Sequence, residues 1–228
     1  KTVQIADKYN EPGKFSALIG YEWTPNPGGG DNLHRNVIYR DGANLAMQEL
    51  PLTTFQTMDP EKLWEWMEKY EAKTGGKLLA IPHNGNLSNG WMFDDITLTS
   101  KKPLDRDYAE RRQRWEKLYE VTQMKGQSEA HPSLSPTDEY SRQDLWDRGN
   151  LIGVPKKPGM YSREYWREAL KSGLRLETSL GANPFKYGAN GATDTSASPV
   201  SSSRSSGTST CTGLGRPDRK KAKARATA

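Results

Sequence analysis

The sequence predicts a mixed α/β domain in its first 195 residues. Short apolar runs of strand length alternate with longer segments whose apolar residues recur at helical spacing. Glycine, proline and asparagine stand between most of these segments, as expected for connecting loops. With 228 residues, the chain is long enough for one domain with a sizeable core. The alternation favours a sheet with mostly parallel strand pairing.

Five apolar runs of strand length follow one another along the chain. They cover residues 15–24, 36–40, 77–83, 118–122 and 185–188. A loop with three consecutive glycines, Gly28-Gly29-Gly30, separates the first two runs. This loop lacks the lysine and the serine or threonine of a phosphate-binding loop, so a nucleotide site of that kind is not expected.

Four helices are predicted, at residues 59–74, 105–115, 135–149 and 162–173. The first has the clearest signals, because Asp59-Pro60-Glu61 combines a capping acid, a proline at the first helical position and an acid in the first turn. Its apolar residues from Leu63 to Tyr70 fall on one face. Ser135-Pro136-Thr137-Asp138 resembles a helix entry and predicts the third helix.

The positive charge of the chain is concentrated near its end. Seven basic residues and one acidic residue after position 200 give that segment a charge of +6, so the first 200 residues carry −1 of the total of +5. Nucleic-acid binding by the body is therefore not expected. The single cysteine, Cys211, excludes an internal disulfide. No run of 18 apolar residues occurs, so no membrane span is expected.

The two ends of the sequence differ from the body. The start lacks an initiator methionine and a signal-peptide pattern, so we expect a piece of a longer protein. Residues 196–228 begin with eight serines among 15 residues and end in a basic run. This composition predicts disorder. The abrupt change after Asp194 also suggests a shifted reading frame near Thr195, with a genuine disordered tail as the alternative.

Residues of metal-ligand type stand at or near the ends of the apolar runs. They are Glu22, His34, His83 and Asp194. Histidine and carboxylate together suit Zn²⁺, Mn²⁺ or Fe, which accept mixed nitrogen and oxygen ligands. A lone histidine is more often structural than a ligand, so the order and context of these residues carry the argument.

Several motifs occur together in a specific order. They are Gly20-Tyr21-Glu22-Trp23-Thr24, Asn32-Leu33-His34-Arg35-Asn36-Val37, Ala80-Ile81-Pro82-His83-Asn84-Gly85-Asn86-Leu87-Ser88, Tyr119-Glu120-Val121 and Gly191-Ala192-Thr193-Asp194. Together they resemble the DUF3604 family, a branch of the PHP (polymerase and histidinol phosphatase) superfamily. The resemblance covers residues 1–195, and the joint match is more specific than any single motif.

The resemblance implies part of a distorted (β/α)7 barrel that holds divalent metal ions at its strand ends. Metal-activated water would attack a small phosphoester substrate. Glu22 would bridge two metals, and the further ligands would be His34, His83 and Asp194. Glu120, on a matching strand, would support the ligands without binding the metal.

Three further residues of these motifs are candidates for the site. Arg35, beside His34, is a candidate to face a substrate phosphate, and an ordinary surface arginine is the alternative. Asn84 is a candidate to hydrogen-bond substrate, and Asn86 a candidate to orient the ligands. For both asparagines, the alternative is a plain Asn-Gly turn.

The chain departs from the family pattern in two places. The opening His-x-His and a later Asp-His motif are absent, and Ser196 stands where the closing histidine is expected. A half-set of ligands predicts weak metal affinity and a fragment that is inactive alone. The alternatives are a non-catalytic module or a nucleic-acid binder acting through the basic tail. A serine hydrolase is not expected, because no Gly-x-Ser-x-Gly motif occurs.

Overall fold

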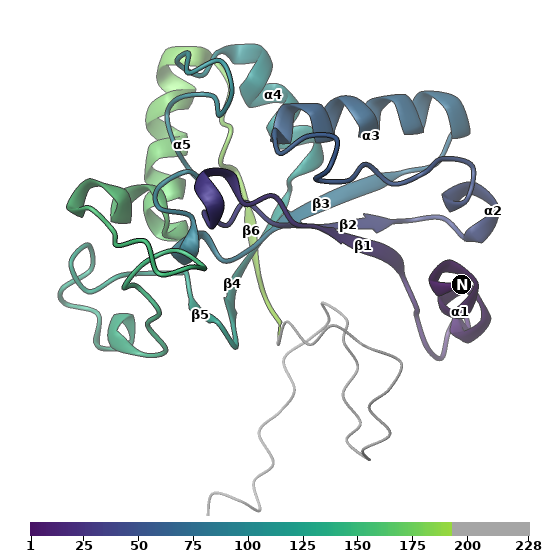
Figure 1. Cartoon of the computed structure of the whole chain (residues 1–228), viewed down its shortest axis with the longest axis horizontal. Helices are drawn as coiled ribbons and strands as arrows, with labels where there is room; N and C mark the ends of the chain where they lie inside the picture. The colour runs from purple at the N-terminus through teal and green to yellow at the C-terminus, as the bar shows by residue number, and fades with distance from the viewer. Residues whose placement is uncertain (193–228) are drawn as a thin grey trace, which may run out of the picture.

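The computed structural model describes residues 1–192. A first sheet has the order β1-β2-β3, with β1 at Ile19–Trp23, β2 at Arg35–Tyr39 and β3 at Leu78–Pro82. Both strand pairs in it are antiparallel. Figure 1 shows β1, β2 and β3 side by side across the middle of the molecule.

A second sheet has the order β5-β4-β6, with β4 at Leu118–Gln123, β5 at Gly126–Gln127 and β6 at Gly188–Gly191. β4 pairs antiparallel with β5 and parallel with β6. A single parallel bridge between His83 and Glu120 connects the two sheets. The end of β3 therefore lies beside the middle of β4.

The mixed α/β architecture is confirmed, whereas the expectation of mostly parallel pairing is wrong. β1 and β2 are joined by a loop without a crossover helix, and such neighbours pair antiparallel. Residues 1–192 form two small sheets and no closed barrel. The predicted tail, residues 196–228, lies outside the described residues. None of the helices within residues 1–192 is long and apolar enough to cross a membrane.

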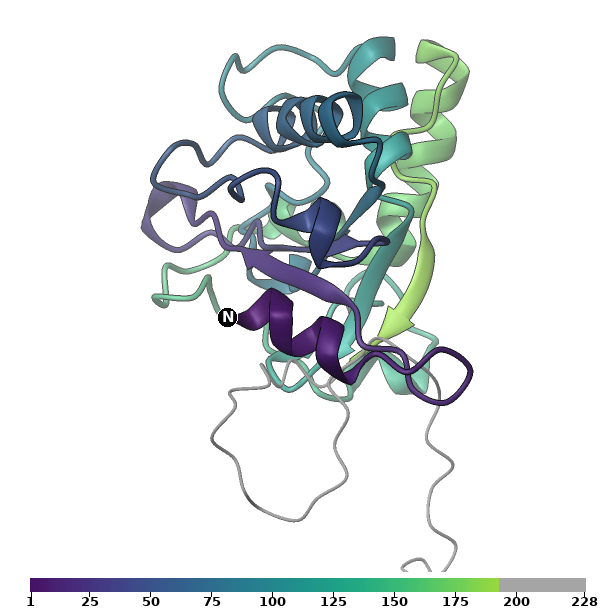
Figure 2. The ribbon, with the colours of Figure 1, turned by 90° about the vertical axis from the view of Figure 1, so that its right-hand side faces the viewer.

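Within residues 1–192, five α-helices accompany the sheets. They are α1 (Thr2–Tyr9), α2 (Ala43–Ala46), α3 (Pro60–Thr74), α4 (Arg106–Trp115) and α5 (Trp166–Leu180). Short 3₁₀ turns lie at η1 (Pro27–Gly29), η2 (Gly85–Leu87), η3 (Glu139–Arg142) and η4 (Pro158–Arg163). Figure 1 shows α3 and α4 above the first sheet, with α1 and α2 near the start of β1. Figure 2 gives the view at 90°.

The signals that predicted α3 are confirmed in detail. The Asp59 side chain accepts a hydrogen bond from the Glu61 N–H, and Gly75 ends the helix in the left-handed conformation. The predicted apolar face is buried. It packs on the first sheet, where Tyr70 meets Tyr39 edge-on at 5.4 Å between ring centroids. Local capping and burial therefore agree, which is why this helix was predictable.

The helix predicted at residues 135–149 is wrong. Only the 3₁₀ turn η3 forms there. The Ser141 hydroxyl donates to the carbonyls of Ser135 and Asp138, and Asp144 adopts a left-handed φ of 50°. Side chains that bond to nearby main chain compete with helical hydrogen bonding, so the segment stays irregular.

The helix predicted at residues 162–173 is displaced toward the C-terminus. α5 begins at Trp166 and continues to Leu180, where Gly181 ends it in the left-handed conformation. Gly173 is not a stop signal. It lies in mid-helix, at a place where a Cβ atom would collide with the Asn183 side chain. Close packing against Asn183 therefore explains the glycine at this position.

The Glu116 carboxylate is fully buried in the core, at 0% exposure. One oxygen accepts hydrogen bonds from Arg35 Nε at 3.0 Å and Trp64 Nε1 at 3.1 Å. The other accepts from Arg112 Nε at 3.0 Å and from the Tyr187 hydroxyl at 3.3 Å. Burial alone would raise the pKa of Glu116, but the two arginines hold the pKa below its ordinary value. This cluster ties β2, α3, α4 and the segment before β6 together.

Replacing Glu116 with alanine should strongly destabilise the fold. The substitution leaves two buried guanidinium groups without a counter-charge, which typically costs about 3–5 kcal/mol of the free energy of unfolding. Urea denaturation followed by tryptophan fluorescence measures the change. Glu65→Ala, which breaks an exposed ion pair with Lys62, is the control and should have little effect. Equal effects of both substitutions would contradict the role of the buried cluster.

Candidate metal centre

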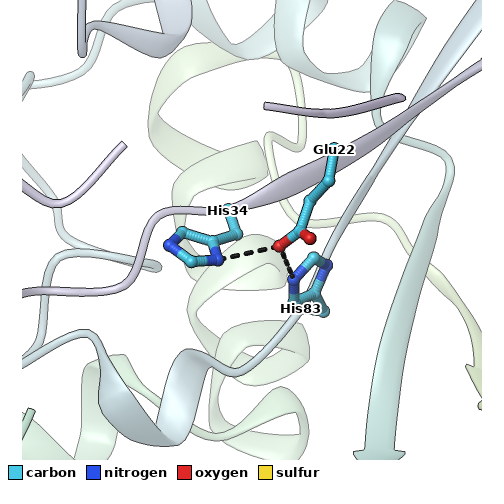
Figure 3. Close-up of side chains that lie close together, drawn as sticks. All are labelled: Glu22, His34 and His83. Carbon is cyan, nitrogen blue, oxygen red and sulfur yellow. Dashed lines mark hydrogen bonds and ion pairs between the residues drawn. The ribbon is translucent and has the colours of Figure 1, made fainter. Parts of the chain in front are cut away.

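The ends of the first-sheet strands bring Glu22, His34 and His83 together. Glu22 lies in β1 opposite Asn36 of β2. His34 immediately precedes β2, His83 immediately follows β3, and the His83 N–H donates to the His34 carbonyl at 3.4 Å. Residues that face each other across antiparallel strands share one face of the sheet. The three side chains therefore meet on the same face, as Figure 3 shows.

Both imidazole rings point toward one carboxylate oxygen. Glu22 Oε1 lies 2.9 Å from His34 Nδ1 and 3.1 Å from His83 Nε2. One potential ligand atom from each residue lies within 4.8 Å of the others, so this group can hold a metal ion. The His83 side chain is fully buried, whereas 30% of the Glu22 side chain is exposed. The group is therefore open to solvent on the Glu22 side.

His34 faces hydrogen-bond acceptors at both ring nitrogens. Its Nε2 atom lies 2.9 Å from Asn26 Oδ1, and the Asn26 amide is oriented by donating from Nδ2 to the Thr24 carbonyl at 3.2 Å. A neutral imidazole has a single N–H, so it cannot donate to both Asn26 and Glu22. Burial lowers the pKa of His34 despite the nearby carboxylate, which disfavours a second proton. A cation between His34 Nδ1 and Glu22 would remove this mismatch.

His83 is held differently. Its Nδ1 atom lies 3.5 Å from Asn36 Nδ2, at the long limit of a hydrogen bond. With Asn36 as donor, the His83 proton sits on Nε2 and is donated to Glu22. Hydrogen bonds from both histidines lower the pKa of Glu22, which is ionised at neutral pH. A carboxylate and two imidazoles match the ligand preferences of Zn²⁺, Mn²⁺ and Fe.

Asn26 and Asn36 were missed in the sequence. Asn36 had a usable signal, because it stands two residues after His34 and strand alternation places both on one face. Asn26 had no such signal in the sequence. It lies in the glycine-rich loop and contacts His34 only through the folded path of that loop. Metal-binding histidines usually have their second nitrogen hydrogen-bonded, which is the place these two amides occupy.

Glu120 lies beside the three residues and outside their group. It is 2% exposed and neighbours His83 through the bridge between the sheets. Gln123 Nε2 donates to its carboxylate at 3.1 Å. Burial raises the pKa of Glu120. The role of supporting the ligands without binding the metal stays a prediction for Glu120.

The two predicted asparagines after His83 lie in the turn η2 region. Asn86 Nδ2 donates to the carbonyls of Lys125 and Trp146, both at 3.1 Å. These hydrogen bonds are to main chain and hold the loop in place. None of them is to Glu22, His34 or His83, the side chains that Asn86 was predicted to orient. Asn84 has a left-handed φ of 52° and is 1% exposed. Its carboxamide has no hydrogen-bond partner among the described residues.

The expectation that Arg35 faces a substrate phosphate needs correction. Alternation along β2 directs Arg35 to the face opposite His34 and Asn36. Its guanidinium is 1% exposed and bonds to Glu116 and the Leu33 carbonyl. Arg35 therefore belongs to the core cluster. Asp194, the fourth predicted ligand, lies outside the described residues.

A buried ion pair holds the far end of the loop that follows His83. Glu164 Oε1 accepts from Lys156 Nζ at 2.7 Å and from the Gly90 N–H at 3.0 Å. The two charged side chains are 0% and 1% exposed. Burial raises the pKa of Glu164 to about 7, although Lys156 opposes the shift. The loop of the candidate centre is thus fixed at Asn86 and again at Gly90.

A family model described as "Protein of unknown function (DUF3604)" matches residues 1–226. No curated protein and no solved structure matches the chain.

Removing Lys156 should make the stability of the protein more sensitive to pH. The folded-state pKa of Glu164, about 7, lies above its ordinary value of 4.5, so stability falls as the pH rises through this window. Lys156→Met removes the charge that opposes this rise, so the pKa of Glu164 increases further and stability continues to fall at higher pH. The variant should therefore be destabilised more at pH 8 than at pH 6. Urea denaturation at both pH values measures it. The double variant Lys156→Met/Glu164→Gln should lose the added pH dependence; its persistence would assign the effect to another group.

Proposed function

The chain belongs to the DUF3604 family, and we propose that it is the metal-binding part of a metal-dependent hydrolase of the PHP type that acts on phosphoesters. The observation that supports this most directly is the convergence of two imidazoles on one oxygen of Glu22. A second observation supports the proposal. Both ring nitrogens of His34 face an oxygen acceptor although the neutral ring has one N–H, and a cation bound at Nδ1 would satisfy the second acceptor.

Each residue of the centre has a separate task in this proposal. Glu22 contributes an ionised carboxylate. His34 would bind through Nδ1 while its Nε2–H donates to Asn26. His83 would bind through Nε2 once its proton moves to Nδ1, with the Asn36 carboxamide turned so that its oxygen accepts that proton. A divalent transition metal held there supplies a Lewis acid that activates water and polarises a phosphoryl oxygen. Three protein ligands leave coordination positions open for water and substrate, as in catalytic metal sites.

The proposal predicts that the chain binds Zn²⁺ or Mn²⁺ and loses this binding when a ligand is removed. Glu22→Ala and His83→Ala should each abolish the binding heat in isothermal titration calorimetry. His131→Ala is the matched control, because this third histidine pairs with Asp147 away from the centre. Wild-type affinity in both ligand variants would refute the site.

Because this chain lacks the His-x-His motif and the closing histidine, hydrolysis of an aryl phosphoester is tested on a longer parent protein that carries them. Activity that requires added metal and disappears in His83→Ala, while His131→Ala retains it, is the expected result. Metal binding without any metal-dependent hydrolysis would refute the catalytic part and leave a non-catalytic metal-binding module.

Removing the acceptor at His34 Nε2 should weaken metal binding without breaking the ligand set. Asn26→Ala allows the His34 proton to move to Nδ1, where it competes with the metal. Loss of such orienting partners typically costs about 10–100-fold in metal affinity. Competition with a chromogenic chelator measures the change, and Asn44→Ala, an exposed asparagine in α2, is the control. Unchanged affinity in Asn26→Ala would show that the amide does not orient the ring.

A further inference from the structure

A cavity of about 430 Å³ lies where the parallel pair β4 and β6 begins. Figure 1 shows α4 leading into the start of β4, with β6 beside it. Three of the residues that line the cavity belong to α4, and the other two stand just before β4 and β6. They are Glu110, Gln113, Arg114, Lys117 and Lys186. The cavity shares no residue with the candidate metal centre.

The residues around the cavity carry an excess of positive charge. Glu110 and Arg114 each have an ion-pair partner outside the cavity, at 2.7 and 3.1 Å. Lys117 and Lys186 are exposed, and neither ammonium group has a hydrogen-bond or ion-pair partner within residues 1–192. Two like charges at one small cavity repel each other. An anion bound between them would relieve this repulsion.

The buried Glu116 cluster holds the main chain of both lysines. Lys117 directly follows Glu116, and Lys186 directly precedes Tyr187, whose hydroxyl donates to Glu116 at 3.3 Å. The Gly188 N–H donates to the Lys117 carbonyl at 2.9 Å, which joins the two segments. The two side chains therefore start from fixed points of the fold. Such preorganisation reduces the ordering cost that a bound ligand must offset.

We propose that this cavity binds the phosphate group of a small molecule through Lys117 and Lys186. The lysine ammonium is a compact charge with three donors, and lysine commonly binds phosphate oxygens as a point charge. Gln113 is half-buried, and its carboxamide has no hydrogen-bond partner in the part of the chain that the structure describes. It offers a donor and an acceptor to the rest of the ligand.

The size and charge of the surroundings favour a small ligand over nucleic acid. The cavity volume falls within the range of small-molecule sites, about 300–1,000 Å³. The first 200 residues carry a net charge of −1, so the positive charge at the cavity is local. A nucleic-acid surface needs a basic stripe that follows the phosphate backbone. This inference does not depend on the metal centre or on hydrolysis.

The test is calorimetric titration of the full chain with pyrophosphate at low ionic strength. Metal is first removed on a chelating resin, so that the anion cannot bind through a metal at the other site. Lys117→Ala and Lys186→Ala should each weaken binding about three- to tenfold, as expected for the loss of a charged hydrogen bond at an exposed position. The double variant should lose more than either. Lys117→Arg keeps the charge and should retain most of the affinity.

Lys102→Ala is the matched control. It removes the same charge from another exposed lysine whose ammonium has no partner among the described residues, and it should bind pyrophosphate as wild type does. An equal loss in Lys102→Ala would assign the binding to net charge and overturn the inference. A wild-type chain that does not bind pyrophosphate also overturns it. Unchanged affinity in the double variant does so as well, because the anion would then bind elsewhere, for example to the basic residues after position 200.

Parallel titrations identify the source of the phosphate group. Inorganic phosphate represents the free ion, and glycerol phosphate represents a phosphorylated organic molecule. Binding of either one that is lost in the double variant supports the inference, and the tighter of the two names the ligand class. Failure of both, in a wild-type chain that binds pyrophosphate, would overturn the assignment to a single phosphate group. All of these titrations are made without metal, so their failure leaves the proposed function untouched.

Discussion

The buried Glu116 carboxylate is the interaction on which the arrangement of this domain depends. It is the shared acceptor of two arginines, an indole and a phenol from four separate segments of the chain. A buried charge is tolerated only when each of its neighbours is in place, so the cluster favours one mutual arrangement of β2, α3 and α4. Because Arg35 directly follows His34, the same cluster fixes where the candidate ligand stands.

β2 has two functions because its side chains alternate. Arg35 points into the core, whereas His34 and Asn36 lie on the other face with Glu22 and His83. The core cluster thus positions β2, and the start of β2 presents His34 to the other two candidate ligands. The imidazoles are further set by amides, since Asn26 faces one ring of the pair and Asn36 the other. Such support determines the ring nitrogen available to a metal.

The loop after β3 joins this face to the second sheet. Asn86 binds the main chain of two distant segments, and the buried Lys156–Glu164 pair binds Gly90 at the loop's far end. The bridge from His83 to Glu120 adds the contact between the sheets. The candidate centre therefore lies at the junction of the two sheets.

Local signals in the sequence determined α3, whose cap, first turn and apolar face all lie within 15 residues. The sequence also indicated the apolar runs that form most of the strands, and through a family resemblance it singled out Glu22, His34 and His83. Tertiary structure alone decided the antiparallel pairing, the failure of residues 135–149 to form a helix, and the contact of Asn26 with His34. It also decided that Arg35 belongs to the core, since only the pairing of β2 with its neighbours tells which face each side chain takes. Capping and periodicity act between near neighbours in the chain, whereas strand pairing and burial depend on partners that are distant in sequence.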